Sequence, residues 1–223
     1  MAILIANNWG FYDKPFKYIG HTVREINTRS FDPKFLALEI IEIYDANKLD
    51  LIVFTGGSDI NPALYGEERE VYTDRPDIER DSFEKNLFEI CKELHIPMVG
   101  ICRGAQLLCA LNGGKLYQNV SYHRSTHPLY TRRNSDCEHR VFDVSSTHHQ
   151  MMRPNWKDAY LLAWAQQNSF KDDRPEPEVV WWPGTNSLAV QYHPEFMSET
   201  SAGFVYFTDL VKCLLANGEL DNV

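Results

Sequence analysis

The sequence has few of the features that mark membrane-bound, secreted or nucleic-acid-binding proteins. Its apolar runs all fall short of the roughly 20 residues of a membrane-spanning helix. No basic residues precede the apolar N-terminal residues, as they would in a signal peptide. Acidic residues outnumber basic ones by 31 to 22, and the formal net charge of −9 disfavours a nucleic-acid-binding surface. We therefore expect a cytoplasmic protein whose partners include neither a membrane nor a nucleic acid.

Cysteines are also few. The chain has five, an odd number without regular spacing, which argues against a disulfide framework and favours a reducing compartment. The sequence contains no internal repeat, low-complexity segment or linker. We therefore predict a single domain over residues 1–223, a length that allows a sizeable α/β core.

Short apolar runs alternate with helical stretches in the first half of the chain. Strands are predicted at residues 2–6, 51–55 and 97–101, and helices at about 32–47 and 80–94. This alternation predicts an α/β fold with a doubly wound, mostly parallel sheet and flanking helices.

Further strands and a last helix are expected in the second half. The strands are predicted at residues 115–120, 141–145, 160–165, 178–182 and 188–192, and the helix at about 200–216. Polar or charged composition predicts loops at residues 7–33, 66–79 and 121–140.

The run Gly100-Ile101-Cys102-Arg103-Gly104 is typical of a nucleophile elbow with cysteine as the nucleophile. A strand that turns sharply into a helix strains its corner residue and needs small residues on both sides. The helix N-terminus then favours the thiolate form of the corner cysteine. The alternative is a buried cysteine that only packs in the turn, which is our interpretation of Cys91, Cys109 and Cys213.

A cysteine nucleophile needs a base, and His193 is the best candidate among the eight histidines. It follows a predicted strand, and Glu195 two residues later could orient its ring. The alternative is a histidine that only makes structural hydrogen bonds. After the strand at residues 51–55, Gly56-Gly57 could aim backbone N–H groups into the same cleft. An ordinary turn is the alternative for the two glycines.

Histidines and one further cysteine also raise the question of a metal. The residues concerned are His123, His127, Cys137, His139, His148 and His149. A His-x3-His pair binds zinc when it lies on a helix, but Pro128 and the polar composition argue against a helix there. No closed spacing of four ligands is present either. We therefore expect no metal and no cofactor, with His148 and His149 lining the cleft or capping a strand end.

The motifs together resemble a known family. G-I-C-R-G-A-Q at residues 100–106 and Q-Y-H-P-E at residues 191–195 are similar to the class I glutamine amidotransferases, glutaminases with a Cys-His-Glu triad. T-G-G-S-D-I-N-P-A-L-Y-G-E at residues 55–67 resembles the γ-glutamyl-γ-aminobutyrate hydrolase branch, peptidase family C26. Three more motifs resemble the same branch: residues 79–84, 112–119 and 145–150.

The resemblance implies a flavodoxin-like sheet and a mechanism. Cys102 would attack the γ-carbonyl of a γ-glutamyl amide, His193 would act as base and acid, and Glu195 would orient His193. Two further sets of residues are implied by the family. The backbone N–H groups of Gly57 and Arg103 would form the oxyanion hole, and the glutamyl group would be held by Gln106 and by the backbone around His148, His149 and Gln150.

Three functions remain open at this point. The first is a free-standing hydrolase with a small-molecule γ-glutamyl substrate. The second is a glutaminase subunit that supplies ammonia to a separate synthetase, and the third is a non-catalytic binding module. The sequence also leaves a homodimer open.

Overall fold

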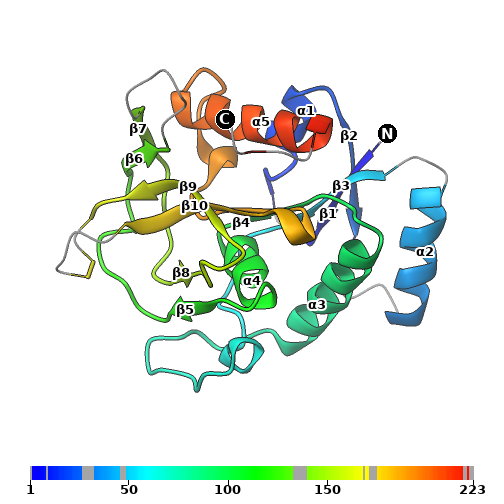
Figure 1. Cartoon of the computed structure of the whole chain (residues 1–223), viewed down its shortest axis with the longest axis horizontal. Coiled ribbons are helices and arrows are strands. Elements are labelled where there is room, and N and C mark those ends of the chain that lie inside the picture. Colours follow the sequence, from blue (N-terminus) through cyan, green and yellow to red (C-terminus); the bar gives the residue numbers. More distant parts are fainter. Residues whose placement is uncertain are drawn as a thin grey trace.

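A mixed sheet runs through the molecule (Figure 1). This computed structural model describes residues 2–8, 10–26, 33–45, 49–132, 140–167, 169–170, 175–217 and 220. Within these residues, nine strands form one sheet in the order β2-β1-β3-β4-β11-β10-β9-β6-β7. A separate pair joins β5 (Lys115–Tyr117) to β8 (Met151–Arg153).

One half of the large sheet is parallel. It consists of β2 (Thr22–Ile26), β1 (Ala2–Ala6), β3 (Leu49–Phe54), β4 (Met98–Ile101) and β11 (Ser187–Val190). Every residue of β1, β4 and β11 is buried, as expected for parallel strands that are covered on both faces. The carboxyl ends of β3, β4 and β11 therefore meet at one edge, where ligands bind in such sheets.

The other half is antiparallel. It continues from β11 through β10 (Glu176–Trp182), β9 (Tyr160–Ala165), β6 (His127–Thr131) and β7 (Val141–Val144). The fully buried β10 pairs directly with β11, so this half is continuous with the strands that carry the predicted site.

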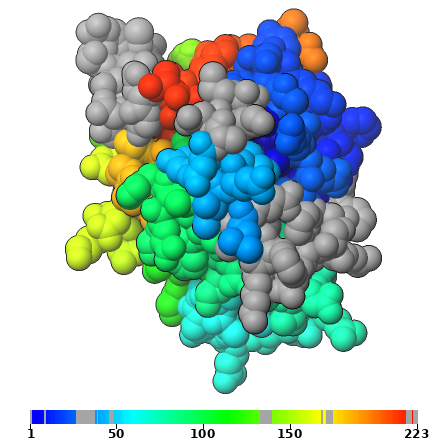
Figure 2. Space-filling view, turned by 90° about the vertical axis from the view of Figure 1, so that its right-hand side faces the viewer, coloured from blue at the N-terminus to red at the C-terminus, as the bar shows by residue number. Residues whose placement is uncertain are grey.

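Helices cover both faces of the sheet. On one face lie α2 (Pro33–Asp45), α3 (Ile78–Glu93) and α4 (Arg103–Leu111), and on the other α1 (Lys14–Tyr18) and α5 (Ala202–Asn217) (Figure 1). The apolar side chains form two clusters accordingly, one with α3 and α4 and one with α1 and α5. Figure 2 shows the side where α2, in light blue, lies beside α3, in green. Among the described residues, no helix combines the length and apolar composition needed to cross a membrane.

The predicted fold class is confirmed, and most predicted strands and helices are present near their expected bounds. Two loop predictions are wrong in part. Residues 7–33 contain α1 and β2, and residues 121–140 contain β6. The strands were missed because β2 is largely exposed and charged, whereas β6 contains a proline. The strand β8 was not predicted either.

Glycine at position 104 allows α4 to pack directly on β3. A Cβ atom there would lie 2.1 Å from the Phe54 carbonyl oxygen, a backbone atom that cannot move aside. We expect Gly104→Ala to lower the free energy of unfolding by at least about 2 kcal/mol, measured by urea denaturation. Gly184→Ala is the matched control, because nothing lies within 4 Å of its Cβ position. Equal stability of the two variants would contradict this packing.

Candidate active site

Cys102 occupies the corner between β4 and α4. Its φ of 54° and ψ of −107° lie outside the regions that non-glycine residues normally adopt. Hydrogen bonds hold the corner on both sides: the Cys102 N–H donates to the Val190 carbonyl at 2.9 Å, and the Gln106 N–H donates to the Cys102 carbonyl at 3.1 Å. A Cβ at Gly100 would lie 2.3 Å from the Gly104 carbonyl oxygen, which explains the spacing of the two glycines. The predicted elbow is therefore present.

His193 lies just beyond β11 and contacts Glu195, as the motif predicts. The Nδ1 atom of His193 is 2.6 Å from Glu195 Oε1, and both residues are buried. The backbone N–H of His193 donates to the Ser145 carbonyl at 2.9 Å, which fixes the residue against the segment after β7. Its Nε2 atom lies 2.8 Å from Thr147 Oγ1, a contact that was not predicted.

The side chain of His193 also hydrogen-bonds to Cys102, so the structure brings Cys102, His193 and Glu195 together. Burial lowers the pKa of His193. The negative charge and hydrogen bond of Cys102 act in the opposite direction, as does Glu195, and together they raise the pKa to about 10. At neutral pH the imidazole is therefore protonated when it faces a thiolate.

Tyr12 is a member of the site that the sequence did not reveal. A Cβ at Gly56 would lie 2.2 Å from the Tyr12 hydroxyl oxygen, so the tyrosine contacts the glycine pair after β3. Burial raises the pKa of Tyr12, and the charges of Glu195 and Cys102 raise it further. The hydroxyl therefore stays neutral near Cys102. It belongs to the segment between β1 and α1, for which composition offered no functional signal.

Buried charges on α3 and α4 support the glycine pair. Arg80 donates to the carbonyls of Thr55, at 2.9 Å, and Gly56, at 3.0 Å. Glu84 accepts hydrogen bonds from both Arg80 and Arg103, and Arg103 also pairs with Asp81. Burial raises the pKa of Glu84, but the two guanidinium groups outweigh this effect and hold it below its ordinary value.

The residues expected to hold the glutamyl group contact different parts of the structure. Gln106 on α4 is buried, and its Nε2 atom donates to the Gln150 carbonyl at 3.2 Å. His149 Nε2 lies 3.2 Å from Asp59 Oδ2, on the side of the loop after β3. His148 Nε2 instead lies 3.2 Å from Glu178 Oε1 on β10. The structure thus joins Gln106 to Gln150 and separates the two histidines, and the binding role remains a prediction.

Part of the histidine-rich set gathers around Glu178. His123, His127 and His148 all point toward this carboxylate. Cys137 and His139 lie outside the described residues. The sequence indicated the three histidines but not Glu178, because this carboxylate comes from the distant strand β10.

Loss of one buried charge in the α3–α4 cluster is expected to destabilise the chain. Glu84→Ala leaves Arg80 and Arg103 without their shared carboxylate, so we expect the free energy of unfolding to fall by about 3–5 kcal/mol. Glu89→Ala on the same helix is the control, because Glu89 is exposed and faces Lys92 at 3.9 Å. Chemical denaturation of both variants measures the difference, and equal stability would contradict the role of Glu84.

The charge of Cys102 is the largest influence that raises the pKa of His193. We therefore expect Cys102→Ala to move the His193 titration midpoint down from about 10, because the imidazolium loses its partner. Two-dimensional NMR of the imidazole nitrogens follows the titration directly. Cys213→Ala, on the half-buried part of α5, should leave the midpoint in place. An unchanged midpoint in Cys102→Ala would show that the two side chains do not interact.

Comparisons with known proteins agree with this site. The model of the Peptidase C26 family matches residues 37–195. A curated protein of Lactococcus lactis, "Putative glutamine amidotransferase-like protein YvdE", is 30% identical over 188 residues, which are 77% of this chain and 75% of that protein. The γ-glutamyl-γ-aminobutyrate hydrolase of Escherichia coli O157:H7 is 40% identical over 76 residues, 33% of this chain and 28% of that enzyme.

A solved structure shows the same fold. The glutamine amidotransferase of Thermotoga maritima superposes with a TM-score of 0.61 at 15% identity, over 98% of this chain and 90% of that one. The family match and the related hydrolase indicate an amide-hydrolysing enzyme. The chain therefore belongs to the peptidase C26 family of class I glutamine amidotransferase-like proteins.

Proposed function

We propose that the chain hydrolyses the γ-glutamyl amide bond of a small molecule, either glutamine or a γ-glutamyl amine. The observation that carries the proposal is the strained corner at Cys102, whose side chain contacts the His193–Glu195 pair. Membership in the C26 family and the match to a γ-glutamyl hydrolase support the same substrate class. A complete set of reacting groups also argues against a purely binding role.

The first half-reaction acylates the cysteine. The Cys102 sulfur attacks the γ-carbonyl carbon, and negative charge develops on the carbonyl oxygen. The backbone N–H groups of Gly57 and Arg103 would stabilise this oxyanion. Gly57 supports the assignment because it adopts a φ of 145°, and a Cβ there would lie 2.4 Å from Arg80 Nη1. Only glycine can adopt this conformation readily beside the buried guanidinium.

His193 completes both halves of the reaction. It donates its proton to the departing amine or ammonia, which breaks the amide bond and leaves a γ-glutamyl thioester on Cys102. It then accepts a proton from water as the water attacks the thioester, and glutamate leaves as the sulfur is expelled. Glu195 keeps the His193 ring oriented throughout, as a carboxylate does in other triads. Between the two half-reactions, the Thr147 hydroxyl would hydrogen-bond to His193 Nε2, the ring nitrogen that does not contact Glu195.

A glutaminase subunit for a separate synthetase is the second candidate. The similarity to the YvdE protein, whose name refers to glutamine amidotransferases, favours it. The two functions share the acylation chemistry and differ in the fate of the leaving group. A subunit would release glutamate from glutamine slowly until its synthetase is added. A free-standing hydrolase would act quickly on one γ-glutamyl amine without any partner.

Cys102→Ala should abolish turnover because no other group can form the thioester. We expect glutamate release from glutamine and from a panel of γ-glutamyl amines to fall by at least about a thousandfold. Thermal unfolding should show that the variant remains folded, and Cys213→Ala should keep full activity. Turnover by folded Cys102→Ala at the wild-type rate would refute the proposed mechanism.

The substrate panel distinguishes the two candidate functions. Fast glutamate release from a single γ-glutamyl amine supports the free-standing hydrolase, and slow release from glutamine alone supports the glutaminase subunit.

A further inference from the structure

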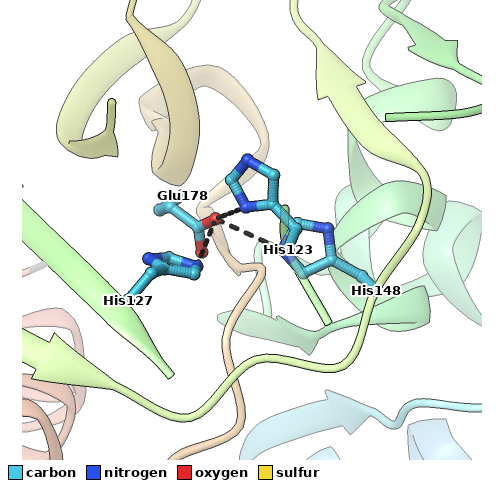
Figure 3. A group of neighbouring side chains, drawn as sticks. All are labelled: His123, His127, His148 and Glu178. Carbon is cyan, nitrogen blue, oxygen red and sulfur yellow. Dashed lines mark hydrogen bonds and ion pairs between the residues drawn. The ribbon is translucent and has the colours of Figure 1, made fainter. Parts of the chain in front are cut away.

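Three imidazole rings surround one carboxylate beside the candidate active site (Figure 3). The nitrogen atoms closest to Glu178 Oε1 are His123 Nδ1 at 3.2 Å, His127 Nε2 at 3.4 Å and His148 Nε2 at 3.2 Å. All four ligand atoms lie within 4.8 Å of one another. Three imidazole nitrogens thus lie within 3.4 Å of one carboxylate oxygen.

The four residues come from three parts of the chain and are buried. His123 precedes β6, His127 begins β6, His148 follows β7 and Glu178 lies in β10. None of the four side chains is more than 1% exposed. Such complete burial of three histidines and a glutamate needs compensation, because each group loses its hydration.

The outer ring nitrogen of each histidine has its own acceptor. His123 Nε2 is 3.2 Å from the Glu176 carboxylate, His127 Nδ1 is 3.2 Å from the Pro128 carbonyl, and His148 Nδ1 is 2.8 Å from the Gln150 carbonyl. Because these oxygens only accept, each outer nitrogen carries the hydrogen. In a neutral ring the inner nitrogen then presents a lone pair to Glu178. Histidines that bind metals are oriented by the same kind of outer contact.

The inner nitrogens of the three rings all lie next to the Glu178 carboxylate. His123 Nδ1 and His127 Nε2 make no hydrogen bond despite their burial, and neither does Glu178 Oε2. A divalent cation among the rings would pair with the carboxylates of Glu176 and Glu178 and would give these buried nitrogen and oxygen atoms a partner.

We propose that His123, His127, His148 and Glu178 bind one divalent transition-metal ion, with Zn²⁺ as the probe of choice. Imidazole nitrogen and carboxylate oxygen are both ordinary zinc ligands. With bonds of about 2.0–2.1 Å, neighbouring ligands of a tetrahedral site lie about 3.4 Å apart. The observed separations of 3.2–3.4 Å from Glu178 Oε1 fit this geometry. This proposal departs from the expectation of no metal.

The ion would act as a structural clamp. It would join β6, β10 and the segment after β7, and no step of the proposed hydrolysis passes through it. His148 directly follows Thr147, whose hydroxyl contacts His193, and the same segment receives the His193 N–H through the Ser145 carbonyl. Fixing His148 would therefore also fix the backbone that supports the catalytic histidine.

A second group of potential ligands, Asp59, Asp74 and His149, is less suitable. Asp74 is exposed, and Asp59 Oδ2 already accepts a hydrogen bond from the Asp74 backbone N–H at 2.7 Å. This group provides a matched control because it contains the same ligand types at a different place.

The test measures metal on the full chain after treatment with a chelator. The stripped protein is dialysed against Zn²⁺ with a weak competing chelator, and bound metal is counted by mass spectrometry. The same experiment in Cys102→Ala excludes binding to the nucleophile. We expect one equivalent of Zn²⁺ in both proteins, together with a rise of several degrees in the melting temperature. Folded protein that binds no Zn²⁺ would overturn the proposal.

Substitutions locate the ion. Glu178→Gln and His127→Gln should each lower the affinity for Zn²⁺ at least tenfold and remove the metal-dependent rise in melting temperature. Asp74→Asn should change neither property. Binding that survives both of the first two substitutions, or that is lost in Asp74→Asn, would refute the site.

X-ray absorption of the Zn²⁺-loaded wild-type chain identifies the metal ligands directly. It therefore tests the site even if the cluster variants do not fold. A first coordination sphere with three imidazoles and no sulfur supports the site. Fewer than two imidazoles, or a sulfur ligand, would overturn it.

Discussion

The close approach of α4 to β3 and β4 is the constraint on which the site depends. Gly100 and Gly104 allow this approach, because a Cβ at either position would overlap backbone atoms. The approach leaves Cys102 at a corner with a positive φ, held by hydrogen bonds to β11 and to its own helix. Packing energy distributed over the buried helix thus maintains a strained conformation at one residue. The fold itself thus holds Cys102 in place.

Buried charged side chains position the glycine pair after β3. Arg80, Glu84, Asp81 and Arg103 neutralise one another in the interior and leave guanidinium N–H groups for the carbonyls of Thr55 and Gly56. An apolar core could stabilise the helices equally well, as replacements of buried ion pairs in other proteins show. It could not hold two peptide carbonyls in a fixed direction. The charged side chains therefore orient the glycine pair. Arg103 contributes its side chain to this cluster, and in the proposed mechanism its backbone N–H stabilises the reacting carbonyl oxygen.

The parallel half of the sheet could be predicted because each of its central strands is an uninterrupted apolar run. The elbow at Cys102 and the pair His193–Glu195 could be predicted because their chemistry requires short, fixed spacings. Tyr12 and Thr147 could not, since each reaches the site from a loop whose path depends on tertiary packing. Glu178 could not be predicted for another reason: it lies within an apolar strand, and the histidines around it come from two other parts of the chain. Spacing along the chain carries no information about such a group.

The edges of the sheet bear on how this chain can associate. Among the described strands, β2 pairs only with β1 and so leaves one row of backbone groups unpaired. Its outward residues include Arg24 and Glu25, both exposed, and charges of this kind disfavour the addition of a strand from another molecule. The charged residues of β2 therefore disfavour pairing between the sheets of two molecules at this edge. Two copies of this chain are therefore not expected to join their sheets through β2.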